Sequence, residues 1–256
     1  MKRILYLFLC IPLLALTQSP SEYAILENGL INANPAKIKE FETNVAAHNK
    51  KYHTDAVYGA RVYWISNGKN IGKYMWVMGP LPWSALDSRP AQEGHDEDWN
   101  TNVLPYVMAE GGDQTYWRFR AELSNFPKDF VLKNVLVDMY DTKRFKDGEV
   151  MALMKKIQKV MTAKYPNETY GIYTNELASM TDGRDLAYVS FFDKSAWMGE
   201  DSKFAEKYNE VHGEGSFAKF LEDWEAVSHG KHSSEIWVFR EDLSGLSGTV
   251  SAVERQ

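Results

Sequence analysis

Two arginines occupy the same place in two closely similar stretches of this sequence. Arg120 lies in YWRFRAELS (116–124), and Arg240 lies in IWVFREDLS (236–244). Guanidinium groups can bind a carboxylate or a phenolate through paired hydrogen bonds. Each arginine is also followed two residues later by an acidic residue. We therefore expect both arginines to form ion pairs with nearby carboxylates, and ligand binding is the alternative.

Histidines and acids are the other side chains that could do chemistry. His48 falls on the apolar side of an expected helix, where we expect a packed, hydrogen-bonded ring. His229 and His232 could hold a metal ion, but the sequence shows no third ligand near them, so we expect surface histidines. The acidic run HDED (95–98) could attract a hard cation, yet neighbouring residues point in different directions. We expect it to begin a helix, whose dipole favours carboxylates. We predict no metal site.

Aromatic residues on the expected strands could wall a ligand pocket. Aromatic residues make up 13% of the chain, so many of them must fill the core or line a cavity. The candidate pocket combines them with the arginines of the closing strands: Tyr63, Trp76, Arg118, Arg120, Tyr188 and Arg240. The sequence contains no nucleophile elbow, phosphate-binding loop or paired catalytic carboxylates.

The first 19 residues are typical of a secretory leader. Lys2 and Arg3 precede the apolar run ILYLFLCIPLLAL, and small polar residues follow it. We expect an exported protein, periplasmic or secreted. Cys10 is the only cysteine, so cleavage would exclude disulfides, thiolate metal sites and cysteine nucleophiles. Loss of Lys2 and Arg3 would take the net charge from −6 to −8, which argues against nucleic acid and anionic membrane surfaces as partners.

Four blocks of the first half recur in the same order in the second half. The closing stretches quoted above are one pair. The others are ENGLI (27–31) with KNVLV (133–137), KYHTDAVYG (51–59) with KYPNETYG (164–171), and GKNIGKYMWVMGPLPW (68–83) with GRDLAYVSFFDKSAW (183–197). A fixed order of similar blocks indicates an internal duplication.

Both copies show the same succession of hydrophobic periods. A buried strand is followed by an amphipathic helix, a hairpin, a second helix and the Trp-x-Phe-Arg strand. The expected strands before the closing one are 23–31, 57–66 and 72–79 in the first copy and 130–140, 170–177 and 185–192 in the second. Pro105 is expected to kink or shorten the second helix of the first copy. The order β-α-β-β-α-β is the ferredoxin-like unit.

A single unit of this kind leaves one face of its sheet without helices. The outward face of the second closing strand is half apolar, whereas a sheet facing only water would be more polar. We therefore predict an α+β fold in which two tandem ferredoxin-like repeats, 20–127 and 128–256, pack sheet-to-sheet as an intramolecular pseudo-dimeric α/β barrel. A covalently joined partner half predicts a monomer. The tail from about 245 is rich in Gly and Ser, and we expect it to fray or to lie on the surface.

This arrangement resembles the dimeric α/β-barrel superfamily, specifically its antibiotic-biosynthesis-monooxygenase-like branch, in a tandem form. The residues that carry the resemblance are the helix end HNKKYH (48–53), the strands YGARVYWI (58–65) and GKYMWVMG (72–79), Trp83 and the Trp-x-Phe-Arg strand. The family includes cofactor-free oxygenases of polyketide-like quinols, haem-degrading oxygenases and isomerases. The resemblance thus implies a cofactor-independent monooxygenase or isomerase that acts on a small aromatic or hydrophobic molecule in the barrel.

Two alternatives stay open. One is a non-catalytic periplasmic or extracellular module that binds a small ligand or a protein. The other is haem binding or degradation, because haem-degrading members use an Asn on the first strand, a Trp on the third and an axial His on the second helix. Asn28, Trp76 and His95 stand on roughly those elements, although His95 precedes its helix and the second copy has Val189 in place of the Trp. We expect no cofactor, with haem as the alternative.

Overall fold

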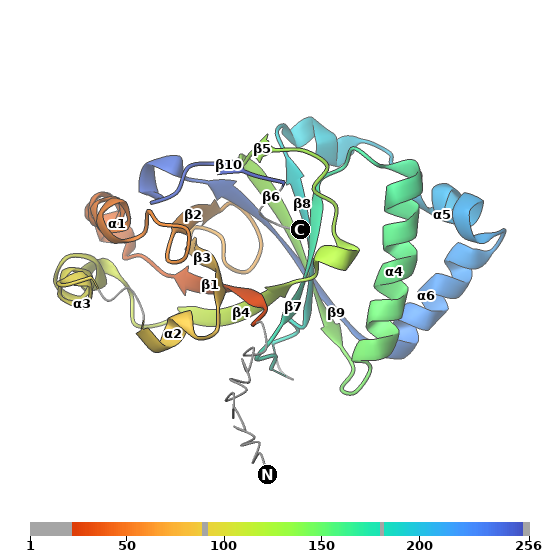
Figure 1. Ribbon diagram of the computed structural model, residues 1–256, viewed down its shortest axis with the longest axis horizontal. Helices are drawn as coiled ribbons and strands as arrows, with labels where there is room; N and C mark the ends of the chain where they lie inside the picture. The colour runs from red at the N-terminus through yellow and green to blue at the C-terminus, as the bar shows by residue number, and fades with distance from the viewer. Residues whose placement is uncertain (1–21, 89–91, 180–181, 253–256) are drawn as a thin grey trace, which may run out of the picture.

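The computed structural model describes residues 22–88, 92–179 and 182–252, and the strands within them close into a single barrel (Figure 1). The expected leader and Cys10 lie outside the described residues. Within those ranges, no helix combines the length and the apolar character needed to cross a membrane.

Eight antiparallel strands form the barrel, four from each half of the chain. The first half provides β1 (Ala24–Ile31), β2 (Ala60–Ile65), β3 (Tyr74–Pro82) and β4 (Asp113–Phe119). The second half provides β6 (Asn134–Thr142), β7 (Tyr170–Asn175), β8 (Leu186–Phe192) and β9 (Ser228–Phe239). The order around the barrel is β1-β3-β2-β9-β6-β8-β7-β4, so both halves place their last strand beside their first, followed by the third and second.

The two repeated Trp-x-Phe-Arg strands join the halves. β9 pairs with β2, with Phe239 opposite Tyr63, and β4 pairs with β7, with Phe119 opposite Tyr173. In each half, therefore, the closing strand pairs with the second strand of the other half. A closed barrel leaves no strand edge unpaired, which removes the usual route to edge-to-edge association.

The residues after each closing strand explain the rest of the repeated stretch. In the first half the chain turns through a 3₁₀ helix, Ala121–Leu123. The Ser124 hydroxyl then donates to the Arg120 carbonyl at 2.8 Å and accepts the Ile172 N–H of β7 at 2.8 Å. The side chain of Leu123 is buried beneath this turn.

The second half repeats the same contacts. After the 3₁₀ helix Glu241–Leu243, the Ser244 hydroxyl donates to the Arg240 carbonyl at 2.7 Å and accepts the Val62 N–H of β2 at 2.9 Å. We call each set of contacts a serine clasp. The Arg-x-acid-Leu-Ser stretch thus holds a closing strand against the opposite half.

Helices cover the barrel on two opposite sides (Figure 1). α1 (Ile38–Tyr52) packs against the first half, and α4 (Asp147–Lys164), α5 (Phe204–His212) and α6 (Ser216–Val227) pack against the second. Before α1, a 3₁₀ helix at Pro35–Lys37 is capped by Asn34, whose side chain accepts the Ala36 N–H. Shorter helical segments are α2 (Ala85–Ser88), α3 (His95–Asp98) and the 3₁₀ helix Ser195–Gly199.

Two expectations about elements need correction. The second helix of the first copy is not continuous: α3 runs into a π-helical turn, Trp99–Val103, and a 3₁₀ turn, Leu104–Tyr106. Pro105 lies in that last turn, where it cannot continue a helical hydrogen-bond ladder. The expected strand 130–140 is also divided, because the short β5 (Phe130–Val131) precedes β6.

The described part of the tail, up to residue 252, neither frays nor lies wholly on the surface, contrary to expectation. β10 (Thr249–Val250) pairs with β5, and Val250 is only 2% exposed because it joins the core inside the barrel. Gly245 also packs closely, since a Cβ atom there would lie 2.0 Å from the His53 carbonyl oxygen. The burial of Val250 therefore orders this segment despite its content of Gly and Ser.

Candidate functional site

The interior of the barrel is filled by side chains. Tyr63, Trp117, Tyr173 and Trp237 are buried there, and the rings of Tyr63 and Trp237 lie 5.9 Å apart. The remaining space is about 80 Å³, whereas one water takes up about 30 Å³ and ligand pockets usually exceed about 300 Å³. The barrel interior therefore does not offer the substrate pocket expected from the sequence, and Tyr63 is a packing residue.

A larger cavity of about 440 Å³ lies between the first half of the sheet and its helices. Side chains on a strand alternate between its two faces. Glu27 and Gly29 of β1 and Trp76 and Met78 of β3 consequently face this cavity, on the outside of the barrel. The opposite wall comes from α1 and from the irregular helical segment that begins at His95.

Three of the six histidines meet at this cavity. His48 lies on the inner side of α1, and His53 follows the last residue of that helix, with its N–H bonded to the Asn49 carbonyl. His95 begins α3 directly after Gly94, whose φ of 84° lets the chain turn inward. One ring nitrogen from each histidine lies within 4.8 Å of the other two.

Hydrogen bonds fix the orientation of His53 and His95. His53 Nδ1 lies 2.8 Å from the Tyr58 carbonyl oxygen, and His95 Nδ1 lies 2.7 Å from Oδ1 of Asp96. The other nitrogens of these rings face each other, with 3.2 Å between the two Nε2 atoms. Both rings thus direct Nε2 into the same space.

His48 completes the cluster from within the helix. Its Nδ1 lies 2.7 Å from Oδ2 of Asp98, and its ring centroid is 4.9 Å from that of His95. Burial lowers the pKa of His48, although the bond to Asp98 opposes this effect. Burial also lowers the pKa of His53 to about 4. Both imidazoles are therefore neutral at pH 7.

A carboxylate and an indole complete the wall of the cavity. Glu27 is only 4% exposed, and its Oε1 accepts a hydrogen bond of 2.6 Å from Gln114. The Trp76 indole N–H donates to Asn49 Oδ1 at 3.1 Å, and the ring meets His53 edge to face at 5.0 Å. These bonds hold an acid and an aromatic surface beside the histidines.

The residues of the haem alternative are not all brought together. Trp76 and His95 line the cavity, but Asn28 lies on the other face of β1 and borders the barrel interior. Haem also does not fit the residues present, because the His53 ring, with its Nε2 only 3.2 Å from His95 Nε2, takes up the space that a porphyrin would need beside that nitrogen. The lining residues in the described part of the chain include acids but no Lys or Arg to neutralise propionates.

The second half has its own cavity, of about 690 Å³, between β6–β8 and the helices α4, α5 and α6. The stacked rings of Tyr170 and Tyr188 form part of its wall, with 5.1 Å between their centroids. Burial raises the pKa of Tyr170 to about 12 and raises that of Tyr188 well above its usual value, so both phenols are neutral. Met154, Met161 and Trp224 make the rest mainly apolar, and no histidine is among its described lining residues.

The three arginines of the candidate pocket do not meet. Arg118 stacks on the ring of Tyr23, 3.9 Å from its centroid. Arg120 forms an ion pair with Glu122 at 3.0 Å, and Arg240 forms one with Asp242 at 2.7 Å. The expectation of ion pairs with neighbouring carboxylates is confirmed.

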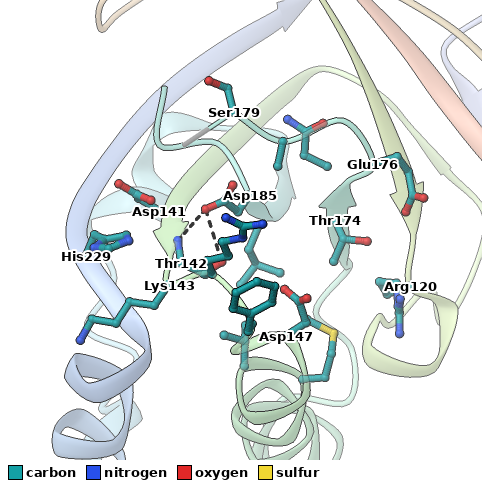
Figure 2. A pocket seen from close by; sticks show the side chains of 17 residues that line it. Arg120, Asp141, Thr142, Lys143, Asp147, Thr174, Glu176, Ser179, Asp185 and His229 are labelled. Carbon is teal, nitrogen blue, oxygen red and sulfur yellow. Dashed lines mark hydrogen bonds between the residues drawn. The ribbon is translucent and has the colours of Figure 1, made fainter. Parts of the chain in front are cut away.

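Arg120 also stands at one edge of a polar cavity of about 560 Å³, seen in Figure 2. Asp185 lies on the opposite side, where its carboxylate accepts the Thr142 N–H at 2.6 Å (Figure 2). Asp141 is buried and pairs with Lys231 at 3.3 Å. Two carboxylates of this cavity thus already have partners, and its walls mix both signs of charge.

The structure also locates the other histidines and the acidic run that were predicted from the sequence. His229 and His232 are exposed, as expected, and His232 stacks on Tyr140. The run 95–98 does begin a helix. His48 is packed and hydrogen-bonded, as expected, but the neighbouring ring of His53 and the carboxylate of Glu27 in the same cavity were missed. The spacing of five between His48 and His53 gave no periodic signal, because it leaves the second residue beyond the helix.

No family model and no curated protein matches the chain. Solved structures do match its fold. A protein assigned as a monooxygenase from Lactobacillus acidophilus gives a TM-score of 0.51 at 12% identity, over 90% of this chain and 99% of that one. A second protein assigned as a monooxygenase, from Fusobacterium nucleatum, gives 0.53 at 9% identity, over 85% and 93%.

A chlorite dismutase from Candidatus Nitrospira defluvii in complex with imidazole gives a TM-score of 0.51 at 8% identity, over 87% of this chain and 95% of that one. At such identities these likenesses show the fold alone. The chain has an α+β fold with a closed eight-stranded barrel like that of these proteins, so the resemblance stated from the sequence is confirmed at the level of the fold.

Proposed function

We propose that this protein is an enzyme that transforms a small aromatic or hydrophobic molecule in the cavity of the first half. The proposal is carried by one observation: three imidazoles and the buried carboxylate of Glu27 face a single cavity of about 440 Å³. The indoles of Trp76 and Trp99 offer an apolar wall for an aromatic ring. Ionisable groups gathered in such a cavity are typical of active sites.

The reaction class follows from the groups that can take up a proton. Oxygenation of a quinol-like molecule and isomerisation both begin when a hydroxyl group, or a carbon next to a carbonyl, loses a proton. A carboxylate or a neutral imidazole at hydrogen-bonding distance can accept that proton. The likeness of the fold to proteins assigned as monooxygenases supports this class by analogy.

The test is turnover of hydroxylated naphthalenes and anthrones, followed by oxygen uptake and by absorbance. Glu27→Gln keeps the size of the side chain and an acceptor for Gln114, and we expect it to lower kcat by about 100-fold or more with little change in KM. His232→Gln, on the surface of the other half, is the matched control. Turnover that is the same in both variants would count against this site.

A second candidate is binding without catalysis in the cavity of the second half. Tyr170 is 1% exposed and lines that cavity, and its hydroxyl has no hydrogen-bond partner among the described residues. A buried hydroxyl normally finds a partner, so a ligand with an acceptor or donor group would complete it. We expect Tyr170→Phe to weaken binding of a planar hydroxyaromatic probe, measured by Trp224 fluorescence, and Tyr165→Phe to change it less.

We also propose export, a monomeric state and an origin by duplication of a ferredoxin-like unit. The leader-like residues 1–19 support export, and N-terminal sequencing of the protein from the periplasm or medium would test it. The closed barrel supports the monomer, because its strands offer no free edge to a second copy. The shared strand order of the halves supports duplication.

A further inference from the structure

The hydrogen-bond partners of the three histidines decide where their protons are. A backbone carbonyl only accepts, so His53 Nδ1 must carry the hydrogen that it gives to Tyr58. Ionised carboxylates also only accept, so the Nδ1 atoms of His48 and His95 carry hydrogens as well. With Nδ1 as the donor in each ring, the Nε2 atoms are left to act as acceptors.

The lone pairs of these acceptors lie close together, and the described residues supply no donor to them. The Nε2 atoms of His53 and His95 are 3.2 Å apart, too close for two acceptors without a cation between them. His48 Nε2 is buried, and none of the described residues donates a hydrogen bond to it. Acceptors on two buried rings and on the partly exposed ring of His95, gathered this closely, require a positively charged or donating species.

We propose that His48, His53 and His95 bind a divalent transition metal ion, of which zinc is the simplest case, through their Nε2 atoms. Tetrahedral zinc with Zn–N bonds of about 2.0–2.1 Å places its ligand atoms roughly 3.3 Å apart. The distance of 3.2 Å between His53 and His95 already meets this requirement. A ring nitrogen of His48 lies within 4.8 Å of the other two, so the third ligand is already close to the ion's position.

The surroundings of the rings suit a metal ion. Metal-binding histidines almost always donate their second N–H to a carboxylate or a carbonyl, and all three rings do so here. The carboxylates of Asp96 and Asp98 lie against the rings of His95 and His48, and their negative charge favours a dication. A ligand set made only of imidazoles suits zinc, copper(II), cobalt, nickel or iron, and it does not suit calcium or magnesium.

Three protein ligands leave a coordination position open toward the cavity. Structural zinc sites are closed by four protein ligands, whereas catalytic sites keep one position for water or substrate. When bound, the ion would supply Lewis-acid chemistry in the cavity, and Glu27 would remain as the proton acceptor. The inference goes beyond the proposed function and does not depend on it, because the metal is argued from the three rings alone.

The test is titration of the chelator-treated protein with Zn²⁺ in a calorimeter and with Co²⁺ in a spectrophotometer, without any substrate. We expect one ion per chain, visible d–d bands typical of four-coordinate cobalt, and a Zn²⁺-dependent rise in Tm. His53→Gln and His95→Gln should each weaken binding by more than about 100-fold, beyond the loss usual for outer-shell changes. His232→Gln should bind like the unmodified protein.

Circular dichroism of each variant shows whether its fold is retained, and His95→Gln, at a partly exposed ring, decides the question if the buried His53→Gln fails to fold. No bound ion, or an ion bound equally well by His53→Gln and His95→Gln, would overturn the metal site. Because the readout needs no substrate, a failed turnover assay leaves this result unaffected, and a failed metal titration does not decide the turnover assay.

Discussion

Each ring of the histidine cluster uses one nitrogen for structure and has the other available for chemistry. For His48, the helix face predicted the first role correctly, because Nδ1 is bonded to Asp98. The second role depends on His53, just after the end of α1, and on His95, at the start of α3 and 42 residues further on. Such proximity arises only from tertiary structure, so no spacing in the sequence could reveal it.

Asp98 tests, at the level of one residue, whether one nitrogen of the His48 ring is held for structure while the other binds the metal ion. Asp98→Asn keeps an acceptor for His48 Nδ1 but removes the charge that raises the basicity of the ring. We expect the affinity for Zn²⁺ to fall by about 10- to 100-fold with the fold retained. Asp96 is the comparison, because its side chain is 89% exposed and solvent screens its charge. A larger loss in Asp96→Asn than in Asp98→Asn would contradict this account.

At the scale of elements, the serine clasps explain why the Arg-x-acid-Leu-Ser stretch occurs twice in the sequence. Ser244→Ala would leave the Val62 N–H without its acceptor inside the protein. An unsatisfied buried group of this kind costs about 1–3 kcal/mol, so we expect the free energy of unfolding in urea to fall by that amount. Ser124→Ala should behave alike, since it makes the same contact with Ile172. Ser202→Ala, at an exposed position, should leave stability within about 0.5 kcal/mol.

The packing of β10 in the tail can be tested with two valines, one buried and one exposed to solvent. Val250 is 2% exposed within the core, whereas Val131, on the strand paired with it, is 58% exposed. We expect Val250→Ala to destabilise the protein by about 1–3 kcal/mol, because it removes buried apolar atoms and leaves a cavity. Val131→Ala should change stability by less than about 0.5 kcal/mol. Equal effects in thermal unfolding would mean that the tail does not pack as described.

The elements were predictable to different extents for identifiable reasons. The alternation of Trp117 and Phe119 with polar neighbours predicted a half-buried closing strand. The same pattern around Trp237 predicted the equivalent strand of the second half. Pro105 predicted a shortened helix but not the π-helical turn that replaces it. The ordered tail was missed because composition does not show that a single Val250 finds space in the core.

At the scale of the molecule, one ion pair connects α1 of the first half to the end of the second. Glu42 bonds Arg240 at 2.6 Å, and this contact lowers the pKa of the carboxyl group. Because the pKa of Glu42 in the folded protein lies below the unfolded value of about 4.3, the ion pair stabilises the fold at pH values above about 4.3. This stabilisation is lost as the pH falls below that value. The stability difference between the unmodified protein and Glu42→Gln should therefore be constant near neutral pH and shrink below about pH 4. A difference that grows in acid would exclude this role.

The way in which the barrel closes predicts how the whole chain unfolds. β2 pairs with β9 and β4 pairs with β7, so each half supplies a strand that the sheet of the other half needs. Neither half can lose its strands without opening the barrel and exposing the core around Trp117 and Trp237. We expect one cooperative transition in which tryptophan fluorescence and far-UV circular dichroism coincide along the urea axis. Two separated transitions, or a fluorescence change that precedes the loss of secondary structure, would show that the halves are independent units.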